Sequence, residues 1–311
     1  PFEGATNRTS VLICQRGQAT RYPLPYTLWR RGTGSARVDI DKPLEEVLEE
    51  TTRANLWAQP VDVQATTSPW MTARKAALRA LQKAIGPAAY QARAGSCTWA
   101  NGVYWVRVIG ERPDGLLLIE NMGDVGNLTV DREQTAVESD LVYPLLRGRD
   151  VGRWQATSAA HILVVQDPDT RKGYAETRMR VEWPHTYSYL KHFEQVLRSR
   201  SGLKQYFDPA TDPFYSMYNV ASYTFAPYKV VWREQAEDFT VAVVGSREGK
   251  AIVPDHKLML VPFEEEQGAH FVCAVLASAI AQLIVKSYVV SVSTSTHVLE
   301  HIAVPRFDAD N

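Results

Sequence analysis

Cysteine is scarce in this 311-residue sequence, and the few cysteines form no pattern. Cys14, Cys97 and Cys273 are scattered, with no CxxC pair and no Cys/His ligand spacing. Such a set argues against a disulfide scaffold and against a zinc site, and it favours a reducing, cytoplasmic setting. His297 and His301 stand four residues apart, as metal ligands can on a helix, but we expect no metal site there.

The sequence also has no excess of charge of one sign and no apolar run long enough for a membrane span. The net charge is −1, from 34 Lys+Arg against 35 Asp+Glu, so no overall basic excess indicates nucleic acid. Residues 141–235 nevertheless hold 13 Lys/Arg against 9 Asp/Glu, a local charge of +4. The apolar run within Gly268–Lys286 is shorter than the roughly 20 residues of a membrane span, which predicts a core helix and no membrane contact.

The N-terminal part predicts two strands and two helices. Neither an initiator Met nor a signal peptide begins the chain, so we interpret it as a fragment of a longer protein. Ser10–Gln15 and Tyr22–Arg30 are typical of a hairpin, whose second strand is an edge strand because it contains prolines, and which needs a partner sheet. The pattern predicts helices over Asp41–Ala58 and Ser68–Gly86, and the polar segment Gln59–Thr67 between them predicts a domain boundary.

The remainder of the chain predicts short strands with a few packed helices, an α+β fold. A helix is expected over Pro184–Ser201, where apolar residues recur at helical spacing. Strands are indicated by apolar and β-branched runs bounded by turn residues. These runs are Val103–Ile109, Leu116–Asn121, Leu141–Leu146, Ala160–Gln166, Tyr228–Arg233, Thr240–Val244, Ala251–Val253 and Lys257–Val261.

Two groups of basic residues are candidates for phosphate contact. Arg147, Arg149 and Arg153 follow a strand in a glycine-bearing turn, where guanidinium groups suit phosphate or guanine. Pairing with carboxylates such as Asp150 is the alternative. A second group closes the predicted helix, where cations equally stabilise a helix C-terminus. It consists of Arg198, Arg200 and Lys204.

The loop Gly95–Gly102 carries Trp99 and Asn101 among small residues. An Asn side chain pairs bidentately with an adenine edge, so the loop is a candidate base reader. A plain turn with Asn101 and Gly102 as its turn residues is the alternative interpretation.

Pro213–Arg233 is dense in aromatic residues. Tyr228 and Trp232 lie on one strand face with Val230 between them, and we expect that face to be core. Tyr215 and Tyr218 precede the strand without apolar alternation, so we expect both to be exposed and able to stack on bases. Two cations in the same stretch are further candidates for DNA contact: Lys229 and Arg233.

The order of these motifs resembles the TaqI-like C-terminal specificity region of adenine-N6 DNA methyltransferases from restriction–modification systems. The resemblance covers most of the chain, and it is carried by the order of the motifs more than by any one of them. Ala274–Ser278 is similar to a late helix of that region, although Ala277 stands where the family usually has Asn. The other matching segments are Gly95–Tyr104, Leu141–Trp154, Pro184–Arg200, Ala226–Trp232, Ile302–Phe307 and, for the last catalytic-domain motif, Phe2–Ile13.

The resemblance implies a role and a division of the chain. Residues 1–60 would be the last hairpin and linker helix of a methyltransferase domain, and 61–311 a β-rich target-recognition domain. Such a domain binds double-stranded DNA, reads a short site and positions an adenine for the upstream catalytic domain. A nuclease fused to it or acting beside it would be a further partner.

Catalytic motifs of that family are absent. The chain contains no Asn/Asp-Pro-Pro-Tyr/Phe, which holds the target adenine, and no glycine-rich turn between a first strand and a helix for the cofactor. We therefore expect no catalytic residue and no cofactor in this chain, with S-adenosylmethionine bound elsewhere in the whole enzyme.

Two other classes of function fit exposed aromatic residues. A carbohydrate-binding module stacks them on sugar rings, and a protein-interaction module uses them as hot spots. Only DNA binding should weaken steeply with salt.

Overall fold

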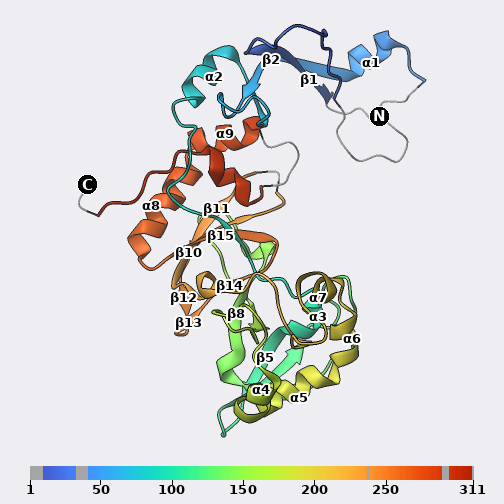
Figure 1. The fold of residues 1–311 in the computed structure, drawn as a ribbon, viewed down its shortest axis with the longest axis vertical. Helices are drawn as coiled ribbons and strands as arrows, with labels where there is room; N and C mark the ends of the chain where they lie inside the picture. The colour runs from blue at the N-terminus through green and yellow to red at the C-terminus, as the bar shows by residue number, and fades with distance from the viewer. Residues whose placement is uncertain (1–9, 33–40, 237, 289–293, 310–311) are drawn as a thin grey trace.

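The computed structural model describes residues 10–32, 41–236, 238–288 and 294–309. Most of the matching segment at Phe2–Ile13 lies outside these residues. The chain forms an elongated molecule with two lobes and an arm of two strands that projects at one end (Figure 1). Helices and antiparallel strands occur in both lobes, which confirms the α+β class.

The arm is built by two long strands, β1 (Leu24–Arg31) and β2 (Thr51–Pro60). They pair antiparallel from Leu24 opposite Ala58 to Arg31 opposite Thr51, and β3 (Trp70–Ala73) pairs with the end of β2. The sheet order is β1-β2-β3, so β1 is an edge strand, as the prolines predict. A short helix, α1 (Leu44–Glu50), precedes β2.

Three predictions for this region are wrong. Ser10–Gln15 forms no strand, and the partner of the edge strand is β2 of the same chain. The predicted helix over Asp41–Ala58 ends at Glu50, because the β-branched Thr51 and Thr52 begin a strand. The second helix starts at Lys75 rather than Ser68, since Trp70–Ala73 pairs with β2, and it is named α2 (Lys75–Leu81). The domain division at residue 60 stays a prediction.

The upper lobe packs helices on a four-stranded sheet. Its strand order is β11-β10-β15-β4, all antiparallel. The strands are β4 (Arg93–Ala94), β10 (Tyr228–Arg233), β11 (Val241–Val244) and β15 (Leu258–Phe263), and the covering helices are α2, α8 (Glu266–Ala277), α9 (Ala279–Tyr288) and the 3-10 turn η4 (Thr296–His301).

One face of β10 is core, as its alternation predicts. Val230 and Trp232 are 0% exposed and pack with residues of α8 and α9. The Trp232 indole Nε1 donates to the Thr294 carbonyl at 2.9 Å, so its polar atom is also satisfied.

The apolar run Gly268–Lys286 is two helices rather than one. The chain bends by 59° between α8 and α9. Among the described residues, no single helix has the length and apolar composition to cross a membrane, and only this bent pair, taken together, does.

The lower lobe holds a six-stranded sheet in the order β14-β8-β9-β5-β6-β7. Its strands are β5 (Trp105–Glu111), β6 (Leu116–Asn121), β7 (Gln134–Glu138), β8 (Val142–Leu146), β9 (Ala160–Leu163) and β14 (Val253–Pro254), which largely confirms the predicted ones. The predicted helix over Pro184–Ser201 is interrupted at Phe193. The helices here are α3 (Asn101–Tyr104), α4 (Glu176–Glu182), α5 (Pro184–His192), α6 (Glu194–Ser199) and α7 (Ser201–Tyr206).

The two sheets are joined where β14 of the lower sheet is followed directly in the chain by β15 of the upper sheet. β14 pairs parallel with β8 in the lower sheet, and after three residues the chain continues as β15 in the upper sheet. Short elements complete the chain: a hairpin of β12 (Ser246–Arg247) and β13 (Lys250–Ala251), and the 3-10 turns η1 (Ser139–Leu141), η2 (Gly148–Asp150) and η3 (Ser222–Phe225).

The burial of Trp232 predicts a large effect of truncation. Trp232→Ala should lower the free energy of unfolding by about 3–5 kcal/mol, because it leaves a cavity beneath α8 and α9. Trp154→Ala is the matched control, since that indole is 64% exposed, and it should change stability by less than about 1 kcal/mol. Urea unfolding of both variants measures this, and equal effects would contradict the assignment.

Candidate nucleic-acid interface

Three aromatic rings from distant parts of the chain stack on one another at the surface of the lower lobe. They are Trp99 from the loop before α3, Tyr206 at the end of α7 and Tyr218 from the segment before η3. Tyr206 and Tyr218 have centroids 4.2 Å apart, and Trp99 lies 5.6 Å from Tyr206 and 5.9 Å from Tyr218, with interplanar angles of 12–29°. Tyr206 is 45% exposed and Tyr218 is 37% exposed, while Trp99 is half-buried. We call this group the ring stack.

The Trp99 indole is held in one position by its surroundings. Its backbone has φ 52°, a left-handed conformation that is unusual for a large side chain. The indole lies over Gly202, where a Cβ would come within 2.0 Å of the ring, so only glycine fits. Cys97 and Tyr218 exchange two backbone hydrogen bonds of 2.9 Å, which fixes the Trp99 loop against the segment that carries Tyr218.

Arg200 ties together the three segments that carry the rings. Its guanidinium is buried and donates to the carbonyls of Leu197, Thr98 and Phe214 at 2.8, 2.7 and 2.5 Å. It also lies over the Tyr104 ring, 5.6 Å from the centroid. The prediction that Arg200 contacts phosphate is therefore wrong, since this residue is only 2% exposed and its donors hold the loops instead.

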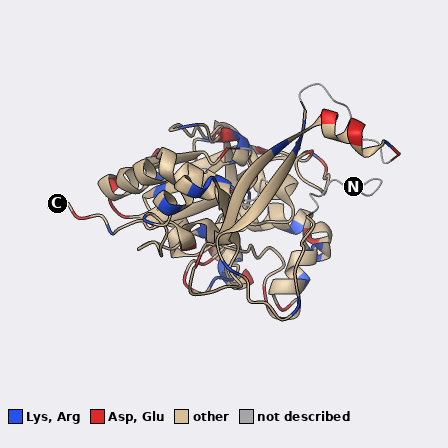
Figure 2. Cartoon of the chain, turned by 90° about the horizontal axis from the view of Figure 1, so that it is seen from above, with Lys and Arg blue, Asp and Glu red and all other residues tan. Residues whose placement is uncertain are grey.

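Five exposed cations between residues 141 and 260 have no ion pair in the described part of the chain. Lys204 is on the same helix as Tyr206, and Arg153 stacks on the Trp154 ring at 4.7 Å. Figure 2 shows Lys and Arg spread over the body among Asp and Glu. For contact with phosphates, the cations without an ion pair are therefore more informative than the net charge of the chain. They are Arg149, Arg153, Arg171, Lys204 and Lys257.

Two of these cations, Arg171 and Lys257, were not singled out from the sequence. Burial raises the pKa of Tyr223, and the charges of Arg93 and Arg171 oppose that rise while Tyr218 adds to it. Burial likewise raises the pKa of the Cys97 thiol, and Lys257 is among the charges that oppose it.

Four polar side chains that were predicted to contact DNA bind other groups of the chain instead. Arg147 forms a two-pronged ion pair with Asp150, at 2.8 and 3.0 Å, and Arg198 pairs with Glu194 at 2.8 Å. The side-chain Oδ1 of Asn101 accepts a hydrogen bond from the Thr98 hydroxyl at 2.6 Å. The Arg233 guanidinium donates to the Val151 carbonyl. The alternative of internal pairing is thus correct for Arg147 and Asp150.

Lys229 and Tyr215 were expected at the surface and are buried. The Lys229 ammonium donates to the Ala226 carbonyl at 2.6 Å, and burial lowers its pKa to about 8. Tyr215 is 0% exposed, packs against Gly173 and donates from its hydroxyl to the Tyr174 carbonyl at 2.6 Å. Both expectations of exposure are wrong, because tertiary contacts that the local pattern does not show cover these side chains.

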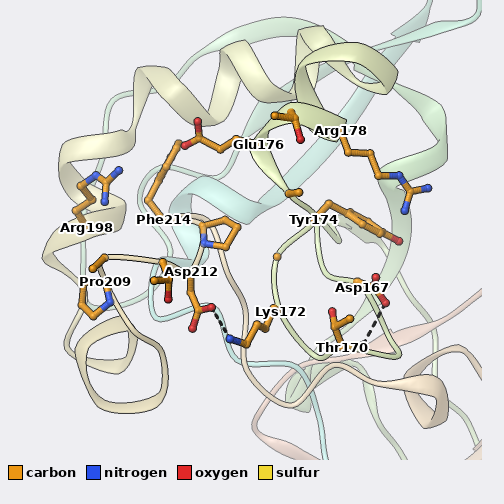
Figure 3. A pocket seen from close by; sticks show the side chains of 16 residues that line it. Asp167, Thr170, Lys172, Tyr174, Glu176, Arg178, Arg198, Pro209, Asp212 and Phe214 are labelled. Atoms are coloured by element: carbon orange, nitrogen blue, oxygen red, sulfur yellow. Dashed lines mark hydrogen bonds and ion pairs between the residues drawn. The ribbon is translucent and has the colours of Figure 1, made fainter.

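A pocket of about 770 Å³ lies between residues 167–178 and residues 209–214 (Figure 3). Its cations are Lys172, Arg178 and Arg198, and each is paired with a carboxylate. Figure 3 shows the Lys172 ammonium directed at Asp212, 2.7 Å away. Cations that already have carboxylate partners attract an anionic ligand only weakly. The pocket is therefore a weaker candidate for a nucleic-acid site than the ring stack.

Metal ligands do not converge anywhere in the described ranges. No group of three or more His, Cys, Asp or Glu there could hold an ion. His297 pairs with Glu300 at 2.8 Å, and His301 packs edge-on against Tyr288.

Tyr206 is the ring that sequence reasoning missed. It follows the basic cluster at the end of the predicted helix, four residues after Gly202. Its position beside two other rings depends on Arg200 and on the Cys97–Tyr218 pairing, which no local pattern reveals. Trp99 and Tyr218, by contrast, were both singled out and lie together.

One curated relative is similar in sequence to part of the chain. The type II methyltransferase M.NspV from Nostoc sp. is 26% identical over 148 residues, which are 47% of this chain and 29% of the relative. The chain thus matches less than a third of that relative's length. No family model matches. The similarity relates the chain to type II methyltransferases of restriction–modification systems.

Arg198, in α6, and Arg200, just after it, provide a test of how the ring stack is held in place. Arg200→Ala should lower the free energy of unfolding by about 3 kcal/mol or more, because three buried carbonyls are each left without a donor at about 1–3 kcal/mol. Arg198→Ala removes an exposed ion pair and should cost at most about 1 kcal/mol. Thermal and urea unfolding measure both, and a stable Arg200→Ala protein would refute the structural role.

Proposed function

We propose that the chain is the DNA target-recognition part of an adenine-N6 methyltransferase. Its similarity to a type II methyltransferase supports the enzyme class, and the ring stack beside unpaired cations supports contact with nucleic acid. The ring stack is the observation that carries the proposal. In the whole enzyme, an upstream catalytic domain would bind S-adenosylmethionine and the target adenine.

The proposed division of labour follows from the chemistry of the exposed groups. Arg149, Arg153 and Lys204 would neutralise phosphates and set the register on the duplex, together with Arg171 and Lys257. Trp99 and Tyr218 would contact bases, since aromatic rings stack on any base. Exposed rings also suit a sugar ligand, but unpaired cations favour a polyanion, and salt dependence separates the two.

Neutralising fewer phosphates should flatten the salt dependence of binding. The double variant Arg149→Ala/Lys204→Ala should bind any duplex more weakly, because two cations no longer face the phosphates. The slope of log Kobs against log salt should fall by about one unit for each cation removed. The measurement is fluorescence anisotropy of a labelled duplex across a salt series.

A control with the same change of net charge is available. Arg178→Ala/Arg198→Ala removes two exposed arginines that already have carboxylate partners, and it should change the slope much less. Equal flattening in both double variants would mean that total charge, and not these positions, governs binding. A wild-type protein without salt-dependent DNA binding would contradict the proposed function.

Methyl transfer should need more than this chain. The 311-residue protein, incubated with labelled S-adenosylmethionine and duplex DNA, should transfer no methyl group, because it has no Asn/Asp-Pro-Pro-Tyr/Phe tetrapeptide. Measurable turnover would overturn the assignment of catalysis to another part. Mapping of methylated bases with the whole enzyme should find N6-methyladenine in one short site.

A further inference from the structure

The ring stack is separate from the cores of the molecule. Three clusters of buried apolar residues hold the described part of the chain together, and neither Trp99, Tyr206 nor Tyr218 belongs to any of them. The rings pack chiefly on one another, with two of them exposed to solvent. Exposed apolar groups gathered in this way mark interaction sites.

The hydroxyl groups of the ring-stack tyrosines differ from those of the fully buried tyrosines. Each of the five buried tyrosines donates a hydrogen bond from its hydroxyl, for example Tyr104 to the Tyr215 carbonyl and Tyr189 to the Val103 carbonyl. Among the described residues, the hydroxyls of Tyr206 and Tyr218 make no such bond. Tyr206 is 45% exposed and Tyr218 is 37% exposed, so both rings are partly open to solvent.

The ring stack is rigid before any ligand arrives. Gly202, the Arg200 guanidinium and the Cys97–Tyr218 pairing fix the three segments that carry the rings. A site that is already ordered loses little conformational entropy when it binds. Backbone strain such as that at Trp99 persists where surrounding contacts enforce it, and it clusters at functional sites.

Nearly parallel rings suit a flat aromatic ligand, and the charges around them indicate which one. Lys204 is an exposed cation without an ion pair among the described residues, and it lies on the short helix α7 that ends at Tyr206. A phosphate held by Lys204 would place a base beside the rings. Bases inside a duplex have both faces covered by their neighbours, so only an unstacked base could use the ring stack.

We propose that the ring stack binds a nucleobase that has left the base stack of a DNA duplex. This inference rests on the proposed function and specifies the form of DNA that is bound best. Because every base has an aromatic face, the ring stack would hold the base without reading its identity. Sequence would then be read elsewhere on the surface.

Two duplexes that differ by one base test the proposal. One is fully paired, and the other carries a single extra 2-aminopurine as a one-base bulge. The bulged duplex should bind about 5- to 150-fold more tightly, the range that corresponds to one stacked base, and its fluorescence should be quenched on binding.

Variants of the rings connect that preference to the site. Tyr206→Ala and Tyr218→Ala should each abolish most of the preference for the bulged duplex and the quenching, while the melting temperature of the protein stays nearly unchanged. Gly202→Ala should also abolish the preference and the quenching, because the added Cβ displaces Trp99 without any change of charge. Trp29→Ala, which removes an exposed indole on the arm, is the matched control and should retain both signals.

The outcomes separate this inference from the proposed function. Salt-dependent binding to both duplexes with equal affinity would overturn the ring-stack proposal and leave DNA recognition standing. No binding to either duplex would overturn both. A preference that survives in Tyr206→Ala and Tyr218→Ala would show that the extra base binds elsewhere, which also overturns it.

Discussion

One buried cation, Arg200, organises the surface that carries the ring stack. No carboxylate pairs with it among the described residues, so three backbone carbonyls and the face of Tyr104 provide its stabilisation. A guanidinium suits this role because its planar fork presents several donors in fixed directions, and because it stays charged when buried. A lysine has one nitrogen and could not reach three carbonyls that diverge. The geometry of Trp99, Tyr206 and Tyr218 depends on this group together with Gly202 and the Cys97–Tyr218 pairing.

Strands were predictable where apolar residues recur at every second position and so lie on one face. β10 shows this best, because alternation placed Trp232 in the core and the structure agrees. The arm was not predictable, since Thr51 and Thr52 follow an acidic helical turn and only pairing with β1 decides that they continue as a strand. The pairing of β2 depends on residues of β1 that lie about 20–30 positions earlier in the chain. Patterns in a single sequence window do not include such distant residues.

The candidate site was predictable in part, for a different reason. Residue type indicates which side chains can contact DNA, but burial and partners decide which of them are available. Tyr215 and Tyr218 stand three residues apart in one loop, and only the first finds a carbonyl and a core. Arg147 has Asp150 within its own turn, so its pairing could be foreseen. Arg200 could not, since its acceptors come from segments up to 102 residues away.

The junction between the two sheets has a consequence for the DNA contact that we propose. Only residues 255–257 separate β14 in the lower sheet from β15 in the upper one, and Gly95 packs directly on the Asp255 carbonyl. A link this short and tightly packed restricts relative motion of the two lobes. If both lobes contact one duplex, as the proposed function implies, part of any deformation would then fall on the nucleic acid. Easily kinked pyrimidine–purine steps would then be favoured at positions the protein never touches.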